Sequence, residues 1–478
     1  MASFFGAISD WVYTYILIAL LIAAGIYFTV RTGAVQIRNF GNMVHDMFSS
    51  REHTMHGGIS SFQAFTVGLA SRIGTGNIAG VAIAILTGGP GAVFWMWVIA
   101  LLGMSTAFVE ATLAQLFKIH WPDGTFRGGP AFYIERGLHS RAMGIVFAIC
   151  LLFSFGLSYE MVQANTISGT LHDAWNVPTW ATAVLLVVIT APIVFGGLKR
   201  VARITEIMAP MMAVVYMLVA IVIIVMNVGN IGHVLSVIFQ SAFGLRQGLG
   251  GVSGGLAAAL LNGARRGLFS NEAGEGSAPN AASTAHTTHP ARQGLIQSFG
   301  VFVDTILVSS ATAFIILNAA PDVYSLDSGS TLDGAALTTA AAASQLGGWI
   351  TPLMIVMIFV FAYSSILGNY SYAEVNVDFL THGSAAGPYV LRSVIVIATA
   401  VGSVAPLQAV WNFADITMAA QAIINLIAIV LLGKWAFGAL NDYRAHPHTP
   451  FVATNNPYMP GDLPTDVWVE AQDEPRHV

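Results

Sequence analysis

The chain has 478 residues, of which 55% are hydrophobic and only 9% are charged. Soluble domains carry about 25% charged residues, so this composition excludes a soluble globular protein and predicts a membrane protein with several spans. The net charge of −5 is spread along the chain and gives no indication of nucleic-acid binding. Cys150 is the only cysteine, which excludes an internal disulfide and a cysteine-rich metal site.

Eleven apolar runs are each expected to cross the bilayer as a helix, which takes about 20 residues. The first run lacks a basic leader and a small-residue cleavage site, so it is interpreted as a retained helix and not as a signal peptide. The tail after Phe437 is rich in Pro, His, Asn and Asp and is expected to be poorly ordered. The expected spans are 11–30, 61–86, 91–118, 143–170, 180–197, 204–227, 250–282, 293–319, 348–370, 388–405 and 411–433.

The orientation follows from the positions of Lys and Arg, which gather in cytoplasmic loops. With eleven spans, all of the 19 Lys and Arg residues fall on one side except Arg72 and Arg246. The 320–347 loop contains several Asp residues and no Lys or Arg, and it falls on the other side. The sequence therefore predicts a multi-pass protein of the cell (inner) membrane, with the N-terminus outside and the C-terminal tail in the cytoplasm.

The second span is interrupted at its midpoint. Gly74 and Gly76 flank Thr75, with Arg72 before them and Asn77 after them. Glycine costs about 1 kcal/mol relative to alanine inside a helix, so this is a plausible place for the helix to open. Small residues can also simply allow close helix packing, although packing requires neither the Arg nor the Asn at this depth.

The seventh span is interrupted as well, since charged, Asn and Gly residues crowd the stretch 262–279. Each interrupted span is followed by four further spans, which predicts two five-helix repeats of opposite topology. The expected divisions are 1–60 for a peripheral helix and loop, 61–228 and 229–436 for the repeats, and 437–478 for the tail. Inverted repeats with a broken first helix are typical of secondary transporters, whose binding site lies at the breaks.

Four stretches resemble the alanine or glycine:cation symporter family. The resemblance covers about residues 10–435 and implies the leucine-transporter-like fold, one small neutral amino acid per cycle and coupling mostly to sodium, with no other cofactor. The stretches are Gly74-Thr-Gly-Asn-Ile-Ala-Gly-Val81 with Gly88-Gly-Pro-Gly91, Val162-Gln-Ala-Asn165, Arg266-Gly-Leu-Phe-Ser-Asn-Glu-Ala-Gly274 with Gly276-Ser-Ala-Pro279, and Gly300-Val-Phe-Val-Asp-Thr305.

The substrate site is expected at the first break. Backbone N–H groups of Thr75 and Gly76 would bind the substrate carboxylate, as at a helix N-terminus, and the Asn77 amide would add a donor. Asn77 could instead only cap the second half-helix. Gln163 would bond the polar end of the substrate, or alternatively a neighbouring helix.

A sodium site follows from the motif match. In this fold class a hydroxyl pair on the ninth span faces carbonyl groups of the first broken helix, and Ser365 is also expected to border the substrate. Each serine could instead bond only the carbonyl one turn before it. The expected sodium ligands are Ala70, Ile73, Phe361, Ser364 and Ser365.

Further pocket residues are expected around the two breaks. Phe269, Ser270 and Gly274 should line the second break, with the aromatic ring shaping and closing the pocket. Where this chain has Gly169 and Asn369, some family members have a bulky aromatic residue and a Trp. A smaller or more polar wall there would admit a longer side chain such as that of glutamine.

Buried charges are interpreted as structural or gating groups. Glu272 and Glu275 are expected to pair with Arg265 or Arg266. Other acids within spans could relay a proton, and the sequence does not choose among them. These are Glu110, Glu206, Asp304 and Asp415.

The leading hypothesis is therefore a sodium-coupled importer of alanine or glycine. The alternative is a symporter for glutamine or a broader set of neutral amino acids, possibly proton-coupled. An intramembrane enzyme is not favoured, because no HExxH motif is present. A channel is not favoured either, because two broken helices indicate an enclosed central site. The sequence does not indicate the oligomeric state.

Overall fold

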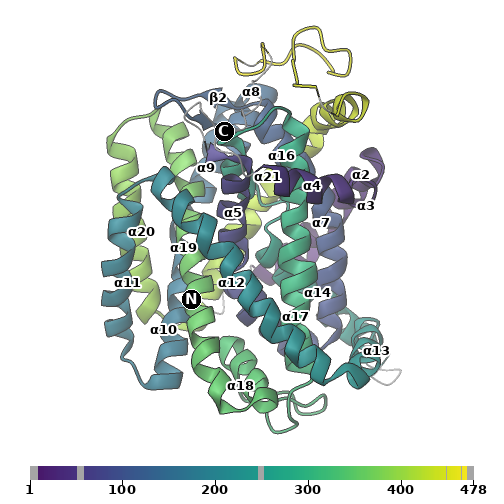
Figure 1. Ribbon diagram of the computed structural model, residues 1–478, viewed down its shortest axis with the longest axis vertical. Helices are drawn as coiled ribbons and strands as arrows, with labels where there is room; N and C mark the ends of the chain where they lie inside the picture. The colour runs from purple at the N-terminus through teal and green to yellow at the C-terminus, as the bar shows by residue number, and fades with distance from the viewer. Residues whose placement is uncertain (1–8, 51–58, 246–251, 448, 465, 471–478) are drawn as a thin grey trace.

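The computed structural model describes residues 9–50, 59–245, 252–447, 449–464 and 466–470, which form a helical bundle (Figure 1). Within these residues eight helical runs are long and apolar enough to cross a membrane, and a further helix pair is bent by 47°. The protein is thus an all-α, multi-pass membrane protein. The eight runs are Ser9–Arg31, Gly91–Leu116, Arg141–Trp175, Leu198–Met226, Pro290–Leu317, Gly348–Thr381, Ala386–Val404 and Leu407–Ala445.

Each of the eleven expected spans contains helix, but the count of eleven and the division into two repeats stay predictions. The helix α11 (Thr179–Val194) has only 16 residues, fewer than the roughly 20 that span a bilayer upright. The helix α14 (Val252–Asn271) contains two arginines and ends at the second break. The expected start of the seventh span, at residue 250, lies outside the described residues.

The remaining bounds are those of the structure. The spans are built from η1 (Tyr13–Leu17), α2 (Ile18–Arg31), α5 (Ser61–Arg72), η2 (Gly76–Gly80), α6 (Val81–Gly88), α7 (Gly91–Leu116), α9 (Arg141–Phe153), η3 (Ser154–Ser158), α10 (Tyr159–Trp175), α12 (Leu198–Met226), α15 (Ala278–Ser283), α16 (Pro290–Val301), η5 (Phe302–Ser309), α17 (Ser310–Leu317), α19 (Thr351–Thr381), α20 (Ala386–Val404) and α21 (Leu407–Ala445). Short helices and turns connect them: α3 (Val35–Arg38), α4 (Phe40–Ser49), α8 (Pro130–Gly137), η4 (Val228–Asn230), α13 (Ile231–Ala242), α18 (Gly334–Leu346) and η6 (Gly348–Ile350).

The first broken helix starts and stops for local reasons. Ser60 and Gln63 form a reciprocal capping box at its start, with both hydrogen bonds at 3.0 Å. The helix α5 ends at Arg72 because Ile73 leaves the helical region, with φ −78° and ψ 79°. The chain resumes as the wide π-helical turn η2, so the interruption predicted at Gly74–Gly76 is confirmed.

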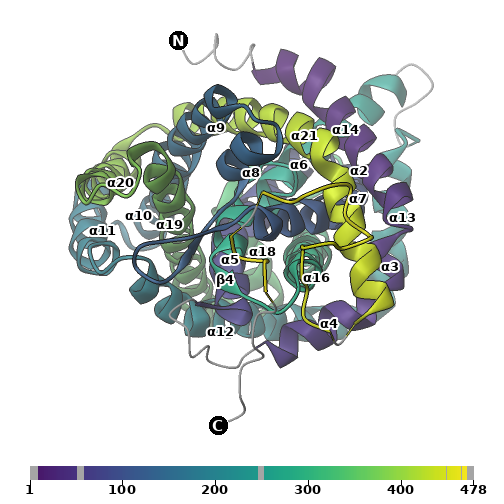
Figure 2. The same cartoon turned by 90° about the horizontal axis from the view of Figure 1, so that it is seen from above.

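The described residues contain two short strand pairs, one between distant parts of the chain and one within a local hairpin. The strand β1 (Ile59–Ser60) precedes the first broken helix and pairs in parallel with β4 (Ala285–His286), which follows the second. The strands β2 (Ile119–His120) and β3 (Phe126–Arg127) form an antiparallel pair. Figure 2 shows α10, α11 and α20 gathered on one side of the bundle, α2 and α13 on the other, and α5 between them.

The expectation that the chain is poorly ordered after Phe437 is wrong for the described part of the tail. The helix α21 continues to Ala445, and the chain beyond it packs against the bundle. Phe451 and Trp468 are buried, and the Trp468 indole N–H donates to the Gln115 carbonyl at 2.8 Å. The prediction was based on the polar composition of the tail and did not take into account these two aromatic residues, which bury apolar surface and hold the segment in place.

Candidate functional site

At the first break, in the middle of the bundle, several backbone and side-chain donors make only long hydrogen bonds or none within the described residues. The Thr75 N–H donates only to Gln163 Oε1, at 3.3 Å, longer than the usual 2.9–3.0 Å or so. The Gly74 N–H is shared between the Arg72 carbonyl at 2.9 Å and Asn77 Oδ1 at 3.3 Å. Thr75 Oγ1 is buried and has no hydrogen-bond partner within the described part of the chain. A ligand with an anionic oxygen would satisfy these donors better than the neutral amides do.

The two glycines of this break are needed for close contacts. A Cβ on Gly74 would overlap Ser365 Oγ, and a Cβ on Gly76 would lie 2.9 Å from the Phe269 ring and 3.3 Å from Ser270 Cα. The structure therefore brings predicted residues from α5–η2, α14 and α19 together at one place. The Phe269 ring packs between those of Tyr159 and Trp411, with centroid separations of 4.7 Å and 4.8 Å.

Asn77 is the centre of a polar cluster between η2, α14 and η5. Its amide nitrogen donates to Ser270 Oγ at 2.8 Å, to the Asp304 carbonyl at 2.8 Å and to Ser309 Oγ at 3.1 Å. It therefore links three elements and does more than cap a half-helix. The Asp304 side chain is fully buried beside this cluster, with Oδ1 bonded to Thr305 and Oδ2 without a hydrogen-bond partner among the described residues.

Four of the five predicted sodium ligands gather where α5 meets α19. Ser365 Oγ lies 2.9 Å from the Ala70 carbonyl and 3.2 Å from that of Phe361. Ser364 Oγ lies 3.3 Å and 2.8 Å from the same two carbonyls. Each serine thus bonds the Phe361 carbonyl of its own helix and also reaches the Ala70 carbonyl of α5, so neither bonds its own helix alone. The sodium site itself stays a prediction. The fifth residue, Ile73, directly follows the last residue of α5.

The second break is wound differently and is filled by the protein's own side chains. Glu272, Gly274 and Gly276 adopt positive φ angles of 56°, 101° and 76°. The Gly274 and Gly276 N–H groups both donate to the Glu110 carboxylate at 3.1 Å. A Cβ on Gly274 would meet Leu426 at 3.0 Å, so this glycine faces α21 and does not line the first break.

The predicted pairing of Glu272 and Glu275 with Arg265 or Arg266 is wrong. Arg266 pairs with Asp415 at 2.7 Å and Arg265 with Asp10 at 2.7 Å. Both arginines lie at least one helical turn before the break. Their side chains therefore reach Asp415 on α21 and Asp10 near the start of the chain, and not the break itself.

The two glutamates find neutral partners instead. Glu272 accepts from Ser71 and Ser277 at 2.7 Å each. Glu275 accepts from the Tyr159 hydroxyl at 3.1 and 3.2 Å. Arg72, buried beside the first break, likewise bonds Gln297 and lies in no ion pair among the described residues.

Gly169 and Asn369 do not lie together. Gly169 lines a pocket of about 130 Å³ with Trp411, next to the exposed Asp173 and Asp333, and a Cβ there would meet nothing within 4 Å. Asn369 lies on the opposite side of the break, with Oδ1 2.7 Å from Ser71 Oγ. Only Gly169 can therefore border a path to the site from the side of α18.

The comparison with known families decides the identity. A model described as the sodium:alanine symporter family matches residues 1–452. The chain belongs to this family. It is therefore a membrane transporter and not an enzyme, and it is a cation-coupled amino-acid symporter. The resemblance predicted from the sequence motifs is confirmed.

Individual relatives support this assignment. The chain is 44% identical to the amino-acid carrier protein AlsT of Bacillus subtilis, over 99% of this chain and 100% of AlsT. It is also 44% identical to the probable sodium/glutamine symporter GlnT of the same organism, over 92% of this chain and 90% of GlnT. The sodium/alanine symporter AgcS of Methanococcus maripaludis is 38% identical, over 90% and 94%.

Solved structures support the leucine-transporter-like fold of this family member. A mutant of the manganese transporter of Eremococcus coleocola superposes with a TM-score of 0.53, covering 80% of this chain and 81% of that one. The two are only 16% identical, so the similarity concerns the fold alone.

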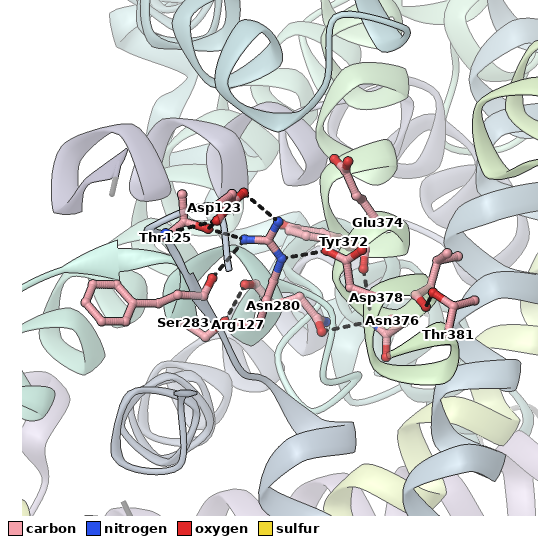
Figure 3. Close-up of polar contacts among 12 residues, drawn as sticks. Asp123, Thr125, Arg127, Asn280, Ser283, Tyr372, Glu374, Asn376, Asp378 and Thr381 are labelled. Carbon is pink, nitrogen blue, oxygen red and sulfur yellow. Dashed lines mark hydrogen bonds and ion pairs between the residues drawn. The ribbon is translucent and has the colours of Figure 1, made fainter. Parts of the chain in front are cut away.

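In this symporter a polar network joins residues of β3, α15 and α19 (Figure 3). Arg127 Nε donates to Asp378 Oδ2 at 2.7 Å, which links the β2–β3 hairpin to α19. The Asn376 amide donates to Asn280 Oδ1 at 2.9 Å, which links α19 to α15. The Arg127 and Asp378 side chains of this ion pair are both buried. The pocket beside Gly169 lies at the opposite end of the bundle, next to α18.

The sequence indicates Glu110 only as one of several buried acids. It stands in a 26-residue helix without another charged residue, and an isolated charge in a span is a functional hypothesis by default. Its partners at the second break are more than 160 residues away, so no local pattern reveals them. Asn425 and Tyr159 escape sequence reasoning for the same reason.

Proposed function

We propose that this protein imports a small neutral amino acid, alanine or glycine, together with sodium by alternating access. The substrate carboxylate binds the Thr75 N–H and hydroxyl at the first break, and Gln163 gives up its contact when substrate enters. The observation that carries the proposal is the combination of an unpartnered hydroxyl and a long N–H bond at one residue of the described chain. The N-terminus lies outside and the tail in the cytoplasm.

The cation binds where α5 meets α19. The Ala70 and Phe361 carbonyls and the Ser364 and Ser365 hydroxyls supply oxygen, the ligand type that hard cations prefer. We infer that the Ile73 carbonyl completes this set. Because Ser365 Oγ lies where a side chain on Gly74 would be, the cation and the substrate carboxylate sit on two sides of one glycine. Sodium bound there holds the break in the shape that receives substrate, which couples the two.

Uptake into proteoliposomes tests the proposal directly. Labelled alanine, glycine and glutamine are offered with an inward sodium gradient, without a gradient, and with a proton gradient alone. Sodium-dependent uptake of alanine and glycine is expected. Uptake that ignores sodium in all three cases would refute the cation assignment.

A broader specificity is the second candidate. The open space beside Gly169 would receive a longer side chain, and a 44% identical relative is a probable sodium/glutamine symporter. Proton coupling has in its favour the Asp304 oxygen beside Asn77 that lacks a partner in the described structure. Glutamine uptake equal to that of alanine would favour the broader specificity. Uptake driven by the proton gradient alone would favour proton coupling.

A further inference from the structure

The backbone at the second break holds an anion of its own. The Glu110 carboxylate, projecting from α7, accepts from the Gly274 N–H through Oε2 and from the Gly276 N–H through Oε1, both at 3.1 Å. The Asn425 amide nitrogen, from α21, donates to the same Oε1. We propose that Glu110 is a positioning residue: its carboxylate occupies a carboxylate-binding site at the second break and holds this break in the shape on which the substrate site depends.

The hydrogen-bond chemistry matches a carboxylate. Three donors point at the two oxygens of Glu110, and its partners in the described structure include no acceptor that would receive an acidic O–H. Asn425 cannot turn its oxygen toward Glu110, because Oδ1 accepts from the Tyr133 hydroxyl and the amide nitrogen also holds the Gly274 carbonyl at 3.0 Å. An ionised carboxylate only accepts and can receive all three bonds, whereas a carboxamide of the same shape would turn an NH₂ donor toward one of these donors.

The backbone conformation of the second break requires a hydrogen-bond acceptor such as the Glu110 carboxylate. Three positive φ values within five residues, one of them at Glu272, turn the N–H groups away from helical partners. Gly276 lies in the same tight region, with a Cβ position 2.8 Å from both Asn425 and Pro130. Backbone donors left without partners inside a membrane protein are costly, so an internal anion stabilises this conformation.

The link to the substrate site is short. Phe269 and Ser270, which contact Gly76 at the first break, immediately precede the second break on α14. Glu272 reaches back across to Ser71 of α5 at 2.7 Å. If the second break loses its shape, both contacts shift, and the first break loses one wall. The inference therefore rests on the proposed function and deepens it.

Chemical rescue tests the proposal. In Glu110→Ala, the atoms removed beyond Cβ are those of acetate, so acetate supplied from solubilisation onward can refill the site. The protein is purified in detergent, and two quantities are measured: the melting temperature and the affinity for labelled alanine. Without acetate we expect alanine affinity to fall about tenfold or more, since two or three buried donors lose their acceptor.

Acetate should raise the melting temperature of Glu110→Ala and restore most of the alanine affinity. Acetamide has nearly the same shape and no charge, and it should do neither. The matched control is Glu160→Ala: this glutamate is equally buried in a span, but neither of its oxygens has a hydrogen-bond partner in the described structure. Acetate should have no effect on that variant.

Three outcomes would overturn the proposal: Glu110→Ala that melts and binds like the wild type, equal effects of acetate and acetamide, or no effect of acetate at all. Glu110→Gln is a second variant that keeps the volume, and it should also bind alanine weakly because its NH₂ group faces backbone donors. A wild type that does not bind alanine would refute the proposed function instead. The melting temperatures would still test the role of Glu110.

Discussion

The two breaks of this symporter use the same backbone chemistry for different ends. At the second, a carboxylate from α7 meets the N–H groups of Gly274 and Gly276 at 3.1 Å. At the first, Thr75 offers an N–H held at 3.3 Å by a neutral amide and a hydroxyl with no partner in the described structure. The N–H groups of Gly274 and Gly276 at the second break have an anionic partner within the protein, whereas Thr75 at the first break has none.

With the predicted two-repeat division and the proposed substrate site, this difference would explain how two similar breaks bind one substrate. Two broken helices supply two sets of free donors, and each set favours an anion. Because Glu110 accepts from one of them, the proposed function assigns the other to the carboxylate of an amino acid. Variants that close, convert or merely disturb the first break can test this difference.

Closing the first break should have the largest effect. Gly76→Leu places a branched side chain where even a Cβ would lie 2.9 Å from the Phe269 ring. Overpacking of this kind costs about 1–3 kcal/mol or more, so binding of alanine should fall by roughly 100-fold or be lost. Equilibrium binding on purified protein measures this. Gly80→Leu, where the Cβ would meet nothing closer than 3.9 Å, should bind substrate far better, and equal losses in both would contradict the assignment.

Converting the first break should have the next largest effect. Gln163→Glu would place a carboxylate against the Thr75 N–H, which makes the first break resemble the second. The new side chain then competes with the substrate carboxylate, and alanine affinity should fall about tenfold or more, given the strength of charge-assisted hydrogen bonds. Gln163→Ala removes only a neutral acceptor and should cost less. Competition assays with both variants measure the order, and the reverse order would mean that the carboxylate binds elsewhere.

Weakening the cation site should have an intermediate effect, seen in the sodium concentration needed for half-maximal uptake. Ser365→Ala removes the hydroxyl that reaches Ala70 at 2.9 Å, so the sodium concentration for half-maximal uptake should rise several-fold, as for one lost hydrogen bond to a charged group. Ser364→Ala should do less, since that hydroxyl lies closer to its own helix, at 2.8 Å from Phe361. Ser371→Ala, whose hydroxyl bonds the Leu367 carbonyl of its own helix, serves as the control. Unchanged sodium dependence in the first two variants would remove the proposed site.

Disturbing the approach should have the smallest effect. Gly169→Phe adds a ring to an open pocket, where the Cβ meets nothing within 4 Å, so uptake should slow by a few-fold, more for glutamine than for glycine. An added group discriminates strongly only in a tight pocket. Asn369→Trp, on the other side of the break, should change the sodium or substrate affinity without altering the ranking of the competitors. Competition by glycine, alanine and glutamine measures both, and a strong change of ranking in Asn369→Trp would place that residue against the substrate.

Much of the helical architecture and the first break could be predicted because their signals are local. Apolar runs of bilayer length mark the spans, and two glycines beside Arg72 mark the place where a helix opens. The serine pair follows from the resemblance, and the structure brings it to Ala70 as expected. These features depend on neighbours in sequence or on a motif.

The errors concern contacts between distant parts of the chain. Sequence proximity pairs Glu272 and Glu275 with arginines a few residues away, but the helix and its break direct those arginines to Asp415 and Asp10. The carboxylate that accepts from the Gly274 N–H could not be predicted either, because Glu110 lies on another helix. Neither periodicity nor composition encodes which buried donor meets which buried acceptor.

The surface on which the tail docks, around Gln115 and Thr288, also implies an order of events during synthesis. Trp468 bonds a carbonyl 353 positions earlier in the chain, and Phe451 bonds Thr288 through its backbone N–H at 2.9 Å. Contacts of such long range form only after the segments between them exist, and a growing chain makes its N-terminal parts first. The tail therefore docks after the last helix has been made, on a surface that earlier helices have already completed. A ribosome-bound chain that ends before Phe451 would leave this surface exposed to solvent. Loss of solvent exposure at this surface would therefore mark the end of assembly.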